Sequence, residues 1–259
     1  MVIMKEKNCN IGLILYEIRN ATGNFITLFF GIAFPILMSV IMTHTIGSQM
    51  PDAVRQTFNT SMVISFSLIG PMAIVLLGYA ANYSQEIEKG VPLRMRLFGY
   101  QEKSLITAKA IAQLVFLTIA LVIYGVADSL LIDIQKPVLS SLLCLILCLY
   151  LLSAIFFVQA HAIASIFKRF GPTYAVTMSL YFGVMILCGM MGITTKQLPK
   201  AMRLIADTLP MTYICNDFID FWQGGSYNFV SLIQSFLFLG AVSGILLLFA
   251  VYQNKRVIK

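Results

Sequence analysis

The sequence predicts an all-α membrane protein, and three observations lead to that fold class. Of the 259 residues, 59% are hydrophobic and only 11% are charged, which is too few charged side chains to cover a water-soluble core of this size. The mean hydropathy is +0.85, so much of the chain requires lipid as its solvent. Six uncharged apolar stretches are long enough to cross about 30 Å of hydrocarbon as helices.

These stretches predict six spans in one transmembrane domain that comprises residues 1–259. The predicted spans are residues 25–45, 61–81, 110–127, 138–167, 173–192 and 229–252. The third span is short, so we expect Lys109 to extend from its start to the interface. The fourth is too long for a straight crossing and must tilt, bend or project. Pro35, Pro71 and Gly78 predict kinks in the first two spans.

The basic residues predict the orientation of the chain. Thirteen of the 18 Lys and Arg residues fall on the side of both termini. The opposite loops keep only Arg55, Lys136, Lys196, Lys200 and Arg203. The positive-inside rule therefore predicts cytoplasmic termini. The net charge of +7 is interpreted as this orientation signal, so no nucleic-acid partner is expected.

Residues 8–22, before the first span, predict an amphipathic helix that lies in the inner interface. Its apolar stripe is Ile11, Ile14, Leu15 and Ile18. Glu17, Arg19 and Asn20 lie on the other faces, as in helices that rest on a membrane surface. A water-exposed amphipathic helix packed on a partner protein has the same pattern, so both interpretations remain open at this point.

The inner connection between the second and third spans predicts a short surface helix, residues 92–98. Glu86, Glu88 and Lys89 end the preceding helix, and Gly90 permits the turn that stops it. Pro92 suits the first position of the new helix.

This short helix is predicted to carry an apolar knob between guanidinium groups. The knob is Leu93, Leu97 and Phe98, and Arg94 and Arg96 project elsewhere. Such a surface suits contact with a cytoplasmic partner. The alternative is an ordinary inner loop that is rich in Lys and Arg but has no defined helix.

The outer segment between the fifth and sixth spans, residues 193–228, predicts a helical hairpin. One apolar stripe is Leu198, Met202, Ile205 and Leu209, and the second is Ile214, Phe218, Phe221 and Trp222. Pro210 separates the two helices. The hairpin is expected to cap the outer mouth of a pathway or to re-enter the membrane shallowly. The alternative is an inert pair of helices in the interface, anchored by Trp222.

Taken in order, these features resemble the permease subunit of an ABC transporter of the type-2 exporter family, in particular bacterial drug or antimicrobial-peptide exporters. The matching motifs are Glu86-Ile87-Glu88-Lys89-Gly90, Leu198-Pro199 and Leu209-Pro210-Met211-Thr212-Tyr213. The resemblance covers essentially the whole chain. Pro92 departs from it, because many relatives have Thr or Ser at this place.

The resemblance implies that residues 91–98 are a coupling helix that sits in a groove of a separate ATP-hydrolysing subunit. Glu86 and Glu88 would be nearby polar contacts. It also implies two ATPase subunits and a second permease, either identical or a close paralogue, in a bacterial cell membrane. The chain contains no G-x4-G-K-[ST] phosphate loop, so ATP and Mg²⁺ are expected on the ATPase. We expect no cofactor, metal or catalytic residue in this chain.

The substrate pathway is weakly specified. Fourteen Met and 19 Phe residues give adaptable surfaces that suit small amphipathic substrates. The candidate pathway residues are Phe30, Phe34, Met38, Phe66, Met72, Tyr79 and Tyr83. Packing between helices or against lipid is the alternative for each of them.

Two other functions remain open from the sequence. A membrane immunity or sensor protein that binds an antimicrobial without transport needs the same spans, but has no use for a coupling helix. An intramembrane protease would draw on Glu86, Glu88 and the Phe157-to-His161 motif. The other histidine, His44, lies near the outer end of the first span, so these groups would have to meet across most of the bilayer. We expect the His161 imidazole to bond to a neighbouring helix.

Overall fold

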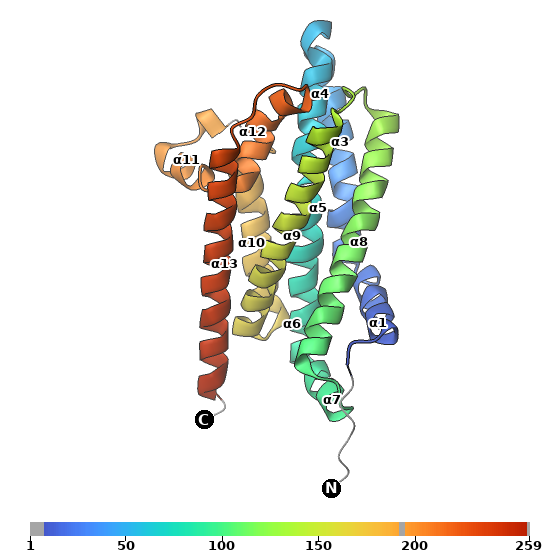
Figure 1. The fold of residues 1–259 in the computed structure, drawn as a ribbon, viewed down its shortest axis with the longest axis vertical. Helices are drawn as coiled ribbons and strands as arrows, with labels where there is room; N and C mark the ends of the chain where they lie inside the picture. The colour runs from blue at the N-terminus through green and yellow to red at the C-terminus, as the bar shows by residue number, and fades with distance from the viewer. Residues whose placement is uncertain (1–7, 192–194, 258–259) are drawn as a thin grey trace.

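The computed structural model describes residues 8–191 and 195–257 of the chain. These residues form a helical bundle without a β-strand, which confirms the predicted fold class. Six helical runs within them are long and apolar enough to cross a membrane. Figure 1 shows these runs side by side along the long axis of the molecule.

The first two runs are each built from several helical segments. The first consists of α2 (Phe25–Leu28), η1 (Phe29–Ala33), α3 (Phe34–Thr45) and η2 (Gly47–Gln49). The second consists of α4 (Asp52–Ser67), α5 (Ile69–Pro71), η3 (Met72–Tyr79) and α6 (Ala80–Glu88). The remaining runs are α8 (Glu102–Leu131), α9 (Leu139–Phe167), α10 (Phe170–Leu187) and α13, which is Phe229–Val257.

The second and third runs are longer than the apolar stretches that predicted them. The second has 37 residues and the third has 30. Hydropathy detects only their apolar middles, whereas the second continues as helix until Pro51 and Gly90 stop it. The predicted end of the fifth span at Gly192 and the start of the outer segment at Ile193 lie outside the described residues.

Regular α-helix is interrupted near the prolines and the glycine that predicted kinks. Pro35 cannot donate a backbone hydrogen bond, and the turn before it widens into the π-helical segment η1. The helix α4 ends at Ser67, four residues before Pro71. A proline ring clashes with the backbone carbonyl four residues before it, so Pro71 accounts for this end. Gly78 lies within the second π-helical segment, η3.

The second run is the centre of the bundle, and it packs closely against the first. Its apolar part is 83% buried, against 22% for the first run. A Cβ added to Gly31 would lie 2.5 Å from Ile74, and one added to Gly78 would lie 2.3 Å from Thr27. Each run therefore has a glycine where a side chain of the other run lies close to its backbone.

The two ends of the bundle differ in their charge. The inner end, as we name it, carries α1 (Ile11–Thr22), α7 (Val91–Leu97) and the last turns of α13 (Figure 1). Among the described residues, it holds Arg19, Lys89, Arg94, Arg96, Lys103, Lys109, Lys168, Arg169 and Lys255. The outer end holds Arg55, Lys136, Lys200 and Arg203. Lys5, Lys7 and Lys259, and the side chains of Lys196 and Arg256, lie outside the described part.

At the outer end, α11 (Lys200–Ala206) and α12 (Pro210–Trp222) form a hairpin. Ile214, Phe218 and Trp222 of α12 are buried against the core. The indole of Trp222 donates a hydrogen bond of 3.0 Å to the Gln135 carbonyl, in the connection between α8 and α9. Trp222 therefore joins two outer connections rather than extending into lipid. In α11, Met202 and Ile205 are exposed.

The close contact between the first two runs gives a stability prediction. Gly78→Ala would force the new Cβ against the Thr27 hydroxyl, so we expect destabilisation by about 1–3 kcal/mol and a lower melting temperature in detergent. Gly125→Ala in α8 is the control, since no heavy atom lies within 4 Å of its added Cβ. We expect it to leave the melting temperature unchanged or to raise it slightly. Equal melting temperatures for the two variants would contradict the close contact.

Candidate functional site

The surface helix α7 is held between two turns that its glycines permit. Gly90 has a φ of 68°, which only glycine adopts at little cost, and it separates α6 from α7. Pro92 occupies the first turn of α7, where its missing N–H costs nothing. Gly99, with a φ of 89°, ends the element. The helix therefore begins and ends within one residue of the predicted range, residues 92–98.

One face of α7 is apolar and points away from the protein. Leu93, Leu97 and Phe98 expose 65%, 68% and 61% of their surface. These three large apolar side chains, two on α7 and one directly after it, form a compact exposed apolar surface at the inner end.

The arginines beside this surface are held by neighbouring groups. The Arg94 guanidinium donates a hydrogen bond of 3.0 Å to the Lys89 carbonyl at the end of α6. Arg96 forms an ion pair with Glu102 in the first turn of α8. Both arginines remain exposed, so their guanidinium groups lie beside the apolar surface.

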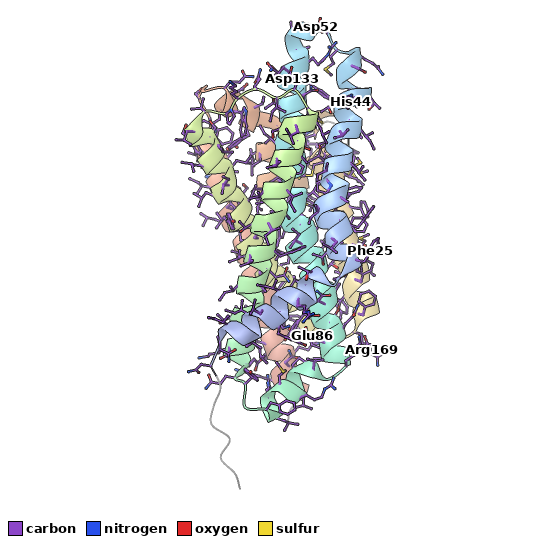
Figure 2. The ribbon with its side chains drawn as sticks, turned by 90° about the vertical axis from the view of Figure 1, so that its right-hand side faces the viewer. Phe25, His44, Asp52, Glu86, Asp133 and Arg169 are labelled. Atoms are coloured by element: carbon purple, nitrogen blue, oxygen red, sulfur yellow. The ribbon has the colours of Figure 1, made fainter. Side chains whose placement is uncertain are left out.

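The opposite face of α7 packs on the bundle. Met95 and Tyr100 contact a small apolar cluster of Leu13 from α1 and Leu105 and Ala108 from α8. The surface helix α7 therefore packs on α1 and α8 together. In Figure 2, α1 lies across the spans just above this level.

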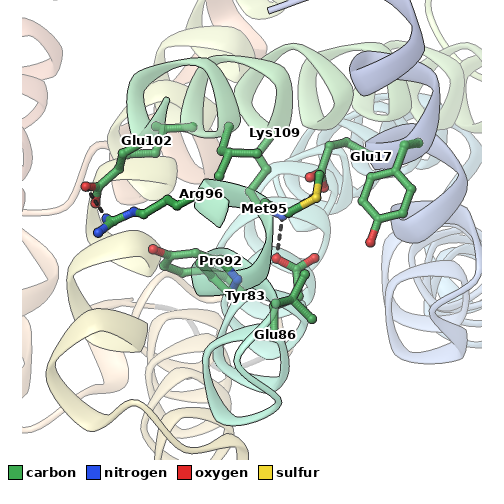
Figure 3. A pocket seen from close by; sticks show the side chains of 12 residues that line it. Glu17, Tyr83, Glu86, Pro92, Met95, Arg96, Glu102 and Lys109 are labelled. Atoms are coloured by element: carbon green, nitrogen blue, oxygen red, sulfur yellow. Dashed lines mark hydrogen bonds and ion pairs between the residues drawn. The ribbon is translucent and has the colours of Figure 1, made fainter. Parts of the chain in front are cut away.

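A buried ion-pair cluster lies directly behind this contact (Figure 3). The Lys109 ammonium in α8 lies 2.8 Å from a Glu17 oxygen in α1 and 2.6 Å from a Glu86 oxygen in α6. The Asn20 amide donates a hydrogen bond of 2.5 Å to the other Glu86 oxygen. All three charged side chains are at most 10% exposed. One cation thus joins three helices that are far apart in the sequence.

The surroundings of Glu17 make the cation necessary. Burial raises the pKa of the Glu17 carboxyl, the positive charge of Lys109 opposes that rise, and the negative charge of Glu86 adds to it. Without Lys109, two carboxylates would face each other away from water. The adjoining cavity has a volume of about 30 Å³, enough for a water molecule but not for a substrate.

This cluster differs from three expectations. Lys109 does not extend to the interface, because its ammonium is neutralised inside the protein. Glu17 lies on the buried face of α1 instead of on a polar outer face, while Ile11 and Leu15 of the predicted apolar stripe are exposed, as contact with lipid requires. Glu86 is buried and bonded within the chain, so its side chain is not free for an ATPase.

Glu88, in contrast, is exposed and lies at the surface of the inner end. One of its oxygens accepts a hydrogen bond of 3.0 Å from the Phe170 N–H, at the first residue of α10. A carboxylate at a helix N-terminus is favoured by the unpaired N–H groups and the helix dipole. Glu88 therefore joins the end of α6 to the fifth span, as Glu86 joins it to α1 and α8.

The seven candidate pathway residues occupy different environments. Phe66, Met72 and Tyr79 are fully buried in the main core. Phe30, Phe34 and Met38 are partly buried and pack against that core. Tyr83 lines cavities at the inner end. In this conformation the three core residues contribute to packing.

The histidines occupy opposite ends of the molecule. His161 in α9 lies 2.9 Å from the Tyr79 hydroxyl, and its ring stacks on Tyr83 at 4.8 Å, so it bonds to a neighbouring helix as expected. His44 lines a cleft at the outer end. Within the described ranges, no cluster of three or more His, Cys, Asp or Glu side chains could hold a metal ion.

A buried acid at the outer end of α8 was missed by the sequence analysis. Asp128 is fully buried, and the Ser39 hydroxyl of α3 donates a hydrogen bond of 2.9 Å to it. Its position directly after the predicted third span suggested an outer loop. The helix in fact continues to Leu131, which turns Asp128 toward α3.

The family model of ABC-2 type transporters matches residues 11–220. The chain belongs to the ABC-2 type transporter family. It is therefore the membrane-embedded permease component of an ABC transporter, which pairs with an ABC ATPase. Searches of curated proteins and of solved structures found no match. The matched range includes α1, α7 and all residues of the ion-pair cluster.

The cluster predicts a strong effect of Lys109. Lys109→Met leaves two carboxylates buried without a cation, so we expect a loss of about 3–5 kcal/mol and a much lower melting temperature in detergent. Combining it with Glu17→Gln and Glu86→Gln removes the uncompensated charges and should restore most of that loss.

Lys103→Met is the matched control, because it removes an exposed lysine from the same helix. We expect it to change the melting temperature little. A Lys109→Met variant as stable as Lys103→Met would show that the cluster contributes nothing.

Proposed function

We propose that this permease is part of an ATP-driven exporter of small amphipathic molecules, with drugs or antimicrobial peptides as the favoured substrates and lipid-linked glycans next. Two copies of an ABC ATPase, which bind ATP and Mg²⁺, would drive a pair of permeases, identical or closely paralogous. The observation that carries the proposal is the apolar surface of α7, which is exposed at the inner end of the bundle, where most of the Lys and Arg residues lie.

In this proposal α7 is the coupling helix. Leu93, Leu97 and Phe98 would enter a groove of the ATPase, and burial of each side chain would contribute about 1.5–3 kcal/mol before the cost of association. Arg94 and Arg96 would orient the contact, with Glu88, Lys89 and Gly90 at its edge. Glu86 would act as a positioning residue inside the protein.

The packing of α7 suggests how movement would reach the spans. ATP-driven closure of the ATPases would push on α7, and Met95 would pass that push to α1 and α8. Because Lys109 binds both α1 and α6, these helices would move with α8 as one unit. The permease pair would then alternate between inward- and outward-open states, with substrate moving along their interface.

The same proposal places both termini in the cytoplasm of a bacterial cell and the α11–α12 hairpin outside. The distribution of Lys and Arg between the two ends supports this orientation. Phe30, Phe34, Met38 and Tyr83 are the candidate pathway residues nearest to a surface or cavity in this conformation. Phe66, Met72 and Tyr79 would contribute only if the bundle opens.

The coupling role of α7 is tested by Leu97→Asn in the full transporter, with the ATPase identified by co-purification with this chain. Leu97 is largely exposed, so we expect an unchanged melting temperature but at least tenfold lower substrate-stimulated ATP hydrolysis and ATPase binding. ATP-dependent uptake of substrate into inside-out vesicles should fall equally.

Leu204→Asn provides a control at the opposite end, where α11 exposes a leucine to 63%. It should leave hydrolysis and ATPase binding unchanged. Equal activity in the two variants would exclude α7 as the coupling element. If no ATPase co-purifies with the unmodified chain, the immunity or sensor function becomes the better explanation.

A further inference from the structure

A second cavity, which we call the inner cleft, lies at the inner end between α6, α8, α9 and α13. Its volume is about 400 Å³, more than ten times that of the cavity beside Lys109. It is lined by Arg96, Lys168 and Lys255, with Glu102 as the acid among the lining residues. Because Glu102 is paired with Arg96, the two lysines supply the positive charge that no acid among the described lining residues compensates.

The inner cleft is polar at the helix ends and apolar farther along the span. Lys255 lies in the last turns of α13, and Leu247, Ala250 and Val251 of the same helix line the cleft closer to the middle of the bundle. Leu247 precedes Lys255 by eight residues, or about 12 Å of helix. A ligand that fits this gradient has an anionic head at the membrane surface and an apolar chain pointing inward.

Lys168 occupies its place at a conformational cost. It follows the end of α9 with a φ of 55°, the one non-glycine residue with positive φ in the described part of the chain. Glycine is the usual residue at such a helix end, and a side chain there costs about 1–2 kcal/mol. The backbone conformation therefore does not favour a lysine here, and what Lys168 adds is a positively charged side chain at a residue that lines the inner cleft.

The inner cleft also holds an unused hydrogen-bond acceptor. Asn254 lines it, and the side-chain oxygen of Asn254 is buried without a hydrogen-bond partner among the residues that the structure describes. A buried acceptor left unpaired costs free energy, and rotation of the Asn254 side chain toward the cleft would let a hydroxyl or amine N–H of a ligand satisfy it. The stacked rings of Tyr83 and His161 also line the inner cleft.

We propose that the inner cleft binds the phosphate-bearing headgroup of an acidic membrane lipid. Lys168 and Lys255 receive the phosphate, Asn254 accepts a hydrogen bond from a headgroup hydroxyl, and the apolar residues of α13 contact the start of an acyl chain. Arg96 belongs to both α7 and the inner cleft, so the lipid lies beside the base of that surface helix. The inference requires only that the chain is embedded in a membrane, and it does not depend on the proposed export.

Native mass spectrometry of the full chain in detergent, titrated with phosphatidylglycerol, tests the inference. We expect one molecule to bind more tightly than phosphatidylcholine with the same acyl chains, because phosphatidylcholine has no headgroup hydroxyl and no net charge. Lys168→Gly should lower the affinity for phosphatidylglycerol about tenfold, the equivalent of one charge-assisted hydrogen bond. The same variant should keep or raise the melting temperature, since glycine suits the backbone at this position.

Lys255→Gln should weaken phosphatidylglycerol binding as much as Lys168→Gly. Lys103→Gln removes an exposed charge at the same end outside the inner cleft, and it should change the affinity less than twofold. Competition by millimolar inorganic phosphate would support a phosphate site that also accepts the soluble ion, and absence of competition would support a lipid-specific site. Equal loss in Lys103→Gln, or equal binding of the two lipids, would overturn the proposal.

Discussion

The buried ammonium of Lys109 is the interaction on which the inner end of this permease depends. A lone ammonium could not remain charged there, and neither could two facing carboxylates, so the three groups require one another. The ion pairs hold α1 against α6 and α8. They thereby also hold in place the apolar cluster of α1 and α8 on which α7 packs. The surface helix and the central span are thereby coupled by charge neutralisation as well as by apolar packing.

The parts of this fold that local sequence determines could be predicted. The six spans follow from hydropathy, and the limits of α7 follow from Gly90, Pro92 and Gly99, whose backbone preferences act within a few residues. The three-way contact of Lys109 could not, because its partners are 92 and 23 residues away. Pairing at that distance depends on how each helix is rotated about its own axis, and a single sequence does not contain that information.

The same limit explains the errors at helix faces and ends. The charged residues of α1 suggested an outward polar face, yet Glu17 points inward, where it forms an ion pair with Lys109. Asp128 seemed to begin a loop, yet no proline precedes it in α8 and the helix continues through Gly125, so Asp128 lies inside the bundle. In both cases the rule that acids avoid the interior fails because a specific partner is present.

The exposed apolar surface of α7 also has a consequence for how the cell makes this protein. A copy synthesised without a partner presents Leu93, Leu97 and Phe98 to water, and such surfaces are those by which chaperones and proteases recognise unassembled subunits. Surplus copies are therefore expected to be degraded. The amount of permease in the membrane would then follow the supply of whichever protein covers α7, without any separate control of its own synthesis.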